Sequence, residues 1–201
     1  MPLQNRVTPF STIEVSPSRG LFTGNRGILH NDRQELVTTN WRHKAWIICE
    51  LEYKGWRRKL MQPGHWTELF FLDEATALAA GHRPCALCRR TAYNQFLKLS
   101  GRPSAKQLDE TIHPQRTNEQ AAISFERLPL NCFYAIGSQA YLKQSTGSLL
   151  WTHSGYQAAD PPPPELQVRP LTPLLTRQVL AQGYQPLLHP SAQQISPTHP
   201  V

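Results

Sequence analysis

Residues 71–89 read FLDEATALAAGHRPCALCR, and this stretch decides the architecture that we expect. The apolar residues before Asp73 are typical of the end of a strand, and Asp73 is a preferred N-cap for the alanine-rich helix that follows it. Gly81 is the residue type that most often stops a helix. Pro84 suits the first turn of a second helix, which is expected to end at Gly101. The stretch therefore predicts a strand, a helix, a cysteine-containing turn and another helix.

Upstream of this stretch, the apolar residues alternate with a period of two over residues 46–53, which predicts a strand. Lys54-Gly55 is a plausible hairpin turn, and the chain is expected to return as a strand to Met61. A further short strand is expected over residues 67–72. Residues 1–40 look irregular or lightly stranded.

Downstream, Ser104 followed three residues later by Gln107 has the pattern of a capping box, which predicts a helix that Pro114 ends. Three short strands separated by turn residues come next. Four consecutive prolines then predict a stiff spacer, followed by a helix that Thr172 caps and a frayed tail. The expected strands cover residues 132–136, 140–143 and 148–152, the spacer 161–164, the last helix 172–182 and the tail 189–201.

Together these elements predict an α+β fold. The first half, residues 1–102, is expected to be zinc-ribbon-like, with a β-hairpin, a cysteine knuckle and a helix. Residues 103–160 form a helix and a small antiparallel β-rich half. Residues 161–201 form the proline-rich spacer, the C-terminal helix and the tail. The same pattern is compatible with one domain that contains all three parts.

Cys85-Ala86-Leu87-Cys88 is the most specific chemical signal in the chain. A Cys-x-x-Cys turn directs two thiolates at one point, which is half of a tetrahedral zinc site. No second Cys-x-x-Cys exists, so the other two ligands must come from single residues. Cys49, on the neighbouring expected strand, and His65, in a turn before Cys85, are the candidates. The sequence thus predicts zinc at Cys49, His65, Cys85 and Cys88.

Other interpretations of the cysteines stay open at this stage. Cys49 lies on the apolar face of its strand, where a free cysteine often acts as a small buried hydrophobe, and Cys132 is expected in the core. A Cys-x-x-Cys at a helix start could also be a redox pair, although the βαβ pattern that usually surrounds one is missing. The two thiols could also remain without a ligand.

The charge of the chain lies in its first half. The chain has 21 basic and 14 acidic residues, of which residues 1–102 hold 15 and 8, so this half accounts for the whole net charge of +7. Concentrated arginine is typical of surfaces that bind phosphate, because the planar guanidinium pairs with it bidentately. The alternative is a solvated basic face without a ligand. The expected nucleic-acid contacts are Arg57, Arg58, Lys59, Arg83, Arg89, Arg90 and Lys98.

Residues 71–89 resemble the second half of the metal-binding domain of the bacterial Ada DNA-repair proteins. The shared features are an aromatic strand, an alanine-rich helix, a Gly-aromatic-Arg-Pro-Cys-x-x-Cys run and basic residues after it. In that family four cysteines hold zinc, and one of the first pair takes a methyl group from a DNA phosphotriester. The resemblance implies zinc at Cys85 and Cys88, and DNA contacts through the basic residues around them.

This chain lacks the family's first cysteine pair, which includes the cysteine that accepts the methyl group. The family's first cysteine pair should lie about 25 to 30 residues before Cys85, but residues 54–61 contain no cysteine. The methyl-accepting nucleophile therefore cannot be carried over. The resemblance covers roughly a tenth of the chain, and nothing after residue 102 is similar to the rest of that family.

The sequence as a whole predicts a zinc-stabilised nucleic-acid-binding protein, with DNA as the expected partner and no small-molecule cofactor. One alternative is an enzyme that acts on nucleic acid, either a metal-dependent nuclease around His30-Asn31 or an alkyl-transfer relative that uses Cys49. The other is a protein-interaction module. No apolar run approaches the length of a membrane span and residues 1–6 lack the apolar core of a signal peptide, so we expect a cytoplasmic protein without a membrane partner.

Overall fold

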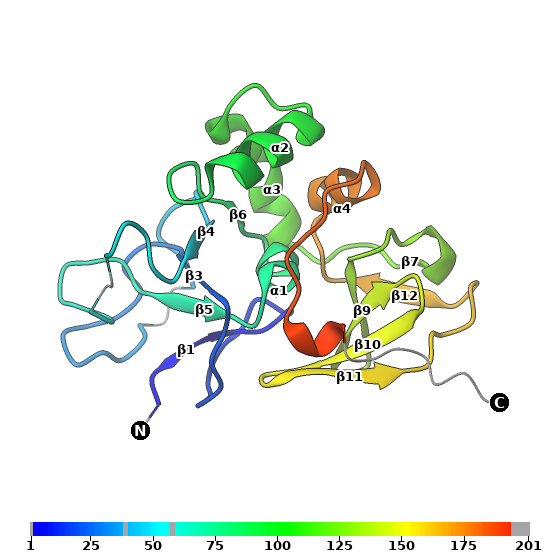
Figure 1. Ribbon diagram of the computed structural model, residues 1–201, viewed down its shortest axis with the longest axis horizontal. Coiled ribbons are helices and arrows are strands. Elements are labelled where there is room, and N and C mark those ends of the chain that lie inside the picture. The colour runs from blue at the N-terminus through cyan, green and yellow to red at the C-terminus, as the bar shows by residue number, and fades with distance from the viewer. Residues whose placement is uncertain (1, 38–39, 57–58, 194–201) are drawn as a thin grey trace.

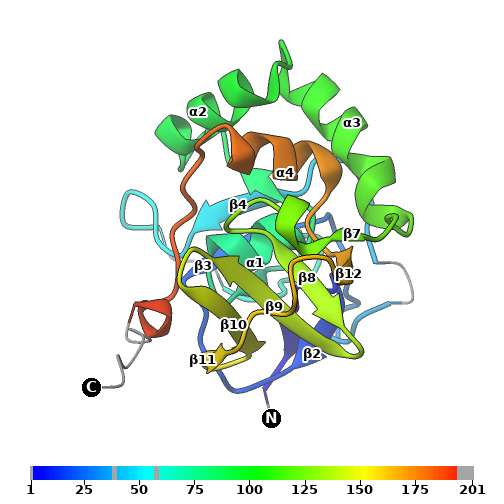
Figure 2. The same ribbon diagram turned by 90° about the vertical axis from the view of Figure 1, so that its right-hand side faces the viewer.

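The computed structural model describes residues 2–37, 40–56 and 59–193, and these residues confirm the expected α+β class. They form two six-stranded sheets and four α-helices. The short helix α1 (Glu74–Ala79) lies between the sheets, as Figure 1 shows. In Figure 2 the helices α2 (Arg90–Ser100) and α3 (Ala105–Thr117) form an arch above α4 (Leu174–Ala181).

The first sheet carries most of the expected basic half, and its strand order is β2-β1-β5-β3-β4-β6. The pairs β1–β5 and β4–β6 are parallel, and the other neighbours are antiparallel. Three of its strands lie in the region that was expected to be irregular or lightly stranded. The strands are β1 (Gln4–Val7), β2 (Ile13–Val15), β3 (Phe22–Asn25), β4 (Ile47–Glu50), β5 (Leu69–Phe71) and β6 (Arg83–Pro84).

The second sheet is antiparallel throughout, with the order β11-β10-β9-β8-β12-β7. The prolines 161–164 connect β11 to β12 within this sheet, so they do not separate two bodies. A short 3-10 helix, η1 (Phe125–Arg127), follows β7. The strands are β7 (Ile123–Ser124), β8 (Phe133–Ile136), β9 (Gln139–Gln144), β10 (Gly147–Thr152), β11 (Gly155–Ala159) and β12 (Gln167–Pro170).

One hydrophobic core joins the three segments that the sequence distinguished. Phe71 of the first sheet, Leu108 of α3, Tyr134 of the second sheet and Val179 of α4 belong to the same cluster of buried side chains. Burial of this apolar surface is the main favourable contribution to folding. The halves of the chain therefore stabilise each other.

Helix α1 confirms the expectation for its two ends. The Asp73 side chain accepts a hydrogen bond from the Thr76 amide at 2.8 Å, which is an N-cap. Gly81 follows the helix with φ of +83°, and a Cβ at this position would lie 2.6 Å from Cδ of Arg116. A glycine is thus required both by the backbone conformation and by the close approach of Arg116. All six residues of the helix are buried, because both sheets pack near it.

The hairpin turn at Lys54-Gly55 is also present. Both residues have positive φ, 53° and 77°, as a tight hairpin turn of this kind requires, and Tyr53 and Trp56 pair across it. Of the expected return strand to Met61, the described residues show only the Tyr53–Trp56 bridge, and residues 57–58 lie outside the described part of the chain.

Two proline-based predictions were wrong. Pro84 lies in β6, where it pairs with Ile48 of the parallel strand β4, and the helix begins only at Arg90. Pro114 lies inside α3, which continues to Thr117. A proline constrains its own backbone and the residue before it, but the turn in which it lies is decided by packing.

The C-terminal segment differs from expectation at both ends. The Thr172 hydroxyl accepts the amide of Phe133 at 2.9 Å instead of capping a helix, and α4 begins after Pro173. The start of the expected frayed tail is tied down, because the His189 amide donates to Asp73 at 3.0 Å and a 3-10 helix, η2 (Pro190–Ala192), follows. None of the helices in the described ranges is both long and apolar enough to cross a membrane.

Candidate metal centre

Three cysteines from two separate segments meet at one edge of the first sheet. Cys49 lies in β4, and Cys85 and Cys88 lie in the turn between β6 and α2. The parallel pairing of β4 with β6 brings the segments together, and the Cys85 amide donates to the Ile48 carbonyl at 2.9 Å. The three sulfur atoms all lie within 4.8 Å of one another. Cys49 is buried, and Cys85 and Cys88 are half-buried.

Backbone amides around the turn point at the sulfur atoms. The Leu87 amide donates to Sγ of Cys85 at 3.4 Å, and the Cys88 amide also faces that sulfur. The Glu50 amide faces Sγ of Cys88. Amide donors favour the thiolate over the thiol, since they stabilise its negative charge. The turn is thus suited to hold deprotonated cysteines.

The thiols influence one another strongly. Hydrogen bonding to Cys85 raises the pKa of Cys49 far above its ordinary value, whereas hydrogen bonding from Cys49 lowers the pKa of Cys85. Cys85 is therefore the cysteine most readily deprotonated, because Cys49 and Cys88 stay protonated and donate hydrogen bonds to its thiolate. A cation at the centre would stabilise all three thiolates at once, and metal binding would release the remaining protons.

The arrangement fits zinc by donor chemistry and by spacing. A Zn–S distance of about 2.3 Å in a tetrahedron separates two sulfur atoms by about 3.8 Å, which lies inside the observed spacing. Zinc accepts three thiolates readily, with a fourth ligand to complete the shell. Among the described residues no other histidine, cysteine, aspartate or glutamate belongs to the cluster.

His65, the fourth predicted ligand, is not brought to the three cysteines. It is exposed in the turn after Pro63, and its Nδ1 lies 3.1 Å from the Pro63 carbonyl oxygen. Cys132 is fully buried in the core, as expected for a small hydrophobe.

Arg89, which follows the cysteine turn, is buried in the interior and does not form the expected basic edge. Its two terminal nitrogens donate to the two carboxylate oxygens of Glu74 at 2.8 and 2.9 Å, and Glu50 lies 3.1 Å from its Nε. Burial lowers the pKa of Arg89, but the Glu74 carboxylate outweighs this effect and leaves the pKa raised. Glu74 also accepts hydrogen bonds from the Tyr184 hydroxyl and the Leu187 amide.

Arg83 is neutralised in the same way. Its Nε and Nη2 each donate to the Asp109 carboxylate at 2.8 Å, and the side chains of both residues are less than a tenth exposed. We expected these two arginines to be free for phosphate. They are instead buried, and each is stabilised there by a carboxylate that accepts two hydrogen bonds from its guanidinium. Neither arginine presents its charge at the surface.

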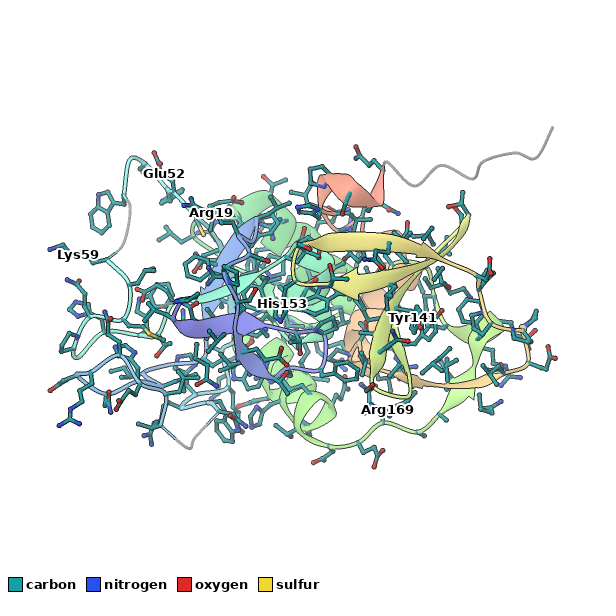
Figure 3. All side chains as sticks on the ribbon, turned by 90° about the horizontal axis from the view of Figure 1, so that it is seen from below. Arg19, Glu52, Lys59, Tyr141, His153 and Arg169 are labelled. Carbon is teal, nitrogen blue, oxygen red and sulfur yellow. The ribbon has the colours of Figure 1, made fainter. Side chains whose placement is uncertain are left out.

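The other predicted contacts are distributed differently. Arg90 and Lys98 are exposed on α2, and Lys59 is exposed in the loop between β4 and β5. Figure 3 shows Lys59 and Glu52 at one end of the molecule, with Lys59 pointing away from it. Arg57 and Arg58 lie outside the described residues.

His30, the residue named for the nuclease alternative, makes hydrogen bonds within the fold. His30 is buried, its Nδ1 lies 2.7 Å from the Thr67 hydroxyl, and its Nε2 lies 3.2 Å from the Gln62 carbonyl. Both ring nitrogens thus have structural partners, and the histidine anchors the loop that ends at Thr67.

Trp56 was not among the nucleic-acid contacts expected from the sequence. Its side chain is 77% exposed at the hairpin turn, which is unusual for the largest apolar residue type. Its position beside the Lys54-Gly55 turn indicates this exposure, because a residue next to a tight turn has few neighbours to pack against.

The comparisons with known proteins add no relative. A scan against protein-family models found no match, and searches of curated proteins and of solved structures found none either.

Proposed function

We propose that this chain is a zinc-stabilised nucleic-acid-binding protein, in which the metal holds the base of a basic loop that contacts the nucleic acid. The observation that carries the proposal is the cluster of Cys49, Cys85 and Cys88 at the point where the loop leaves β4. Cys49 is the last residue but one of that strand, and the loop with Trp56 and Lys59 begins directly after it.

Zinc would have a structural role at this site. Bound by the three thiolates, it would connect β4 to the zinc-ribbon-like turn before α2, and a structural zinc contributes its binding energy to folding. The Arg89–Glu74 pair extends this connection inward, because Glu74 lies on α1 at the centre of the molecule.

The features of the loop support nucleic acid as the partner. Trp56 is exposed between Lys54 and the basic residues 57–59, and an aromatic ring among cations can stack on an unpaired base while the cations contact phosphates. Arg90 and Lys98 supply further exposed positive charge on α2. Stacking requires a free base face, so single-stranded nucleic acid is the preferred form in this proposal.

The zinc part is tested by metal analysis of freshly purified protein. We expect about one zinc per chain, and we expect Cys85→Ser and Cys49→Ser to lose both the metal and stability because the thiolate ligand is gone. Cys132→Ser is the matched control, since Cys132 is buried but outside the cluster. Protein without zinc that is as stable as the reconstituted protein would overturn this part.

The nucleic-acid part is tested by fluorescence anisotropy with a labelled single-stranded oligonucleotide. Trp56→Ala is expected to weaken binding by about 1–3 kcal/mol, the contribution of one stacked base, whereas Trp56→Phe retains most of it. Leu187→Ala is the control, because Leu187 is 58% exposed on another segment. If the wild type binds neither single-stranded nor duplex nucleic acid at low salt, the protein-interaction alternative replaces this proposal.

A further inference from the structure

A second group of cations, the buried Arg26 and the half-buried Arg116, surrounds Trp46 and differs in its partners from the arginines near the cysteines. Arg26 is fully buried, and its guanidinium carbon lies 4.1 Å from the centroid of the Trp46 ring. The guanidinium of Arg116, from α3, lies 4.0 Å from that ring. His82 packs against the same ring at 5.2 Å. Two cations and an imidazole thus share one aromatic side chain.

The hydrogen bonds of this group are incomplete. Arg26 donates through Nε to Nε2 of His82 at 3.2 Å, so His82 is an acceptor there and its proton lies on Nδ1. Arg116 donates to the carbonyls of Gly81 and Lys44. In this group, two buried guanidinium nitrogens have no hydrogen-bond partner among the described residues: Nη2 of Arg26 and Nε of Arg116.

The positive charge of the group is compensated only in part, by the Asp109 carboxylate, which acts on Arg116 without forming an ion pair with it. Among the described residues no carboxylate forms an ion pair with Arg26 or Arg116. Burial lowers the pKa of both arginines to about 9, with the nearby Arg116 charge as a further cause for Arg26. Both remain charged at neutral pH. Burial, with Arg26 and Arg116 close by, lowers the pKa of His82 well below its usual value, so His82 is neutral there.

A cavity of about 190 Å³ lies on one side of this group, between the turn after β1, the end of α1, the end of α3 and β12. Arg116 lines it, and so does Arg169, whose guanidinium lies 5.6 Å from the centroid of the Phe10 ring. Arg26 does not line the cavity but contacts a residue that does, since its Nη1 donates to the Ser11 carbonyl at 3.0 Å and Ser11 is a lining residue. Glu119 is the one carboxylate among the lining residues that the structure describes.

We propose that this cavity binds a small oxyanion of the phosphate type, held by Arg116 and Arg169 with the buried Arg26 behind them. A buried cation without a partner is costly, and an anion in the cavity would supply the missing opposite charge. Guanidinium pairs suit phosphate because they bind it bidentately. The cavity is smaller than the roughly 300–1,000 Å³ of sites for drug-sized ligands, which favours a single oxyanion group.

The site is separate from the proposed nucleic-acid surface. In Figure 3 Arg169 lies beside the second sheet, away from the end of the molecule that carries Lys59. The inference therefore does not depend on the zinc or on the loop with Trp56. The oxyanion could be free phosphate or the terminal phosphate of a larger molecule, and these two sources can be distinguished.

The test is calorimetric titration of the full chain with inorganic phosphate at constant ionic strength. We expect a dissociation constant on the order of 1 mM or lower, and an increase in the melting temperature that follows the phosphate concentration. Arg169→Gln should weaken binding by about tenfold or more without unfolding, because Arg169 is exposed and its loss removes one charge-assisted contact. Arg116→Gln should do the same, although its bonds to Gly81 and Lys44 give it a structural role as well.

Two further variants keep the proposal falsifiable. Lys106→Gln removes an exposed charge from the same helix as Arg116, outside the cavity, and should leave the phosphate affinity unchanged. Glu119→Gln should tighten binding, since it removes a negative charge that repels the anion. Absence of phosphate binding by the wild type, or equal weakening by Lys106→Gln, would overturn the site.

A comparison of oligonucleotides with and without a 5′-phosphate identifies the source of the oxyanion. Tighter binding of the phosphorylated form, lost in Arg169→Gln, indicates a terminal phosphate. Equal binding of both forms together with a response to inorganic phosphate indicates a free anion. Loss of nucleic-acid binding in Trp56→Ala with normal phosphate binding would confirm that the two sites are independent.

Discussion

The arginines beside the cysteine turn and those around Trp46 are stabilised in different ways, although Arg26 is as buried as Arg83 and Arg89 and Arg116 is half-buried. Arg83 and Arg89 each meet a carboxylate with two hydrogen bonds of 2.8 to 2.9 Å. Arg26 and Arg116 meet the face of Trp46 and backbone carbonyls instead, and no described carboxylate pairs with them.

This difference shows what a buried arginine indicates about function. A guanidinium with a bidentate carboxylate is complete, so it stabilises the fold and has nothing left to offer a ligand. A guanidinium with an unused donor and no opposite charge can still bind an anion. The sequence of the cysteine turn suggested Arg83 and Arg89 as ligand-binding residues. The contacts of the four arginines favour Arg26 and Arg116 for that role instead.

The largest loss of stability is expected when the Glu74 carboxylate is removed from its ion pair with Arg89. Glu74→Gln should destabilise the protein by about 3–5 kcal/mol, because it removes the buried, bidentate partner of Arg89 and leaves only the partly exposed Glu50 carboxylate beside its charge. The same change weakens the bonds from Tyr184 and Leu187 that hold the C-terminal segment. Urea denaturation monitored by tryptophan fluorescence measures the free energy of unfolding.

The control for this prediction is Glu126→Gln, since Glu126 is exposed on η1. It should change the unfolding free energy by less than about 0.5 kcal/mol. Equal effects of the two variants would mean that the Arg89–Glu74 pair contributes no more than a surface carboxylate.

A smaller change in the free energy of unfolding is expected when the pH is lowered, because His82 beside Trp46 is held neutral. The pKa of His82 in the folded protein lies well below its value of 6.5 in the unfolded chain, mainly because the ring is buried. The unfolded state therefore binds the proton first, so stability is complete above pH 6.5 and decreases as the pH falls below it. At pH 5 the loss should reach about 2 kcal/mol from this residue.

His82→Gln should remove this dependence, because glutamine can accept the Arg26 hydrogen bond but does not titrate. The difference in unfolding free energy between pH 7.5 and pH 5 should be smaller in this variant than in the wild type. His65→Gln is the matched control, since His65 is exposed. If His82→Gln and the wild type lose stability in parallel, the histidine is not held neutral by its surroundings.

The smallest effect on stability is expected at an exposed cation. Arg90→Gln should change the unfolding free energy by less than about 0.5 kcal/mol, because Arg90 is exposed at the start of α2. If Arg90 contacts phosphate, the log–log salt slope of nucleic-acid binding should become shallower by about 0.7 for a single strand. Lys106→Gln, on α3, should leave the slope unchanged.

Local sequence determined the elements whose signals are short in range. Asp73 and Gly81 predicted both ends of α1, and Lys54-Gly55 predicted the hairpin turn. The Cys-x-x-Cys turn predicted two of the three clustered thiols, and Cys49 was identified as a third from its strand. These signals depend on caps, turn conformations and ligand spacing, which neighbouring residues set almost by themselves.

Only the tertiary structure decided which cysteines and arginines meet and which charges are compensated. The carboxylates that neutralise Arg83 and Arg89 lie 26 and 15 residues away along the chain, and Arg116 reaches Gly81 from 35 residues away. No sequence pattern marks these pairs, because hydrogen bonding and charge compensation depend on distance in space after the core has formed. A guanidinium has the same composition at the surface and in the interior, and its role is set by the groups that folding places around it.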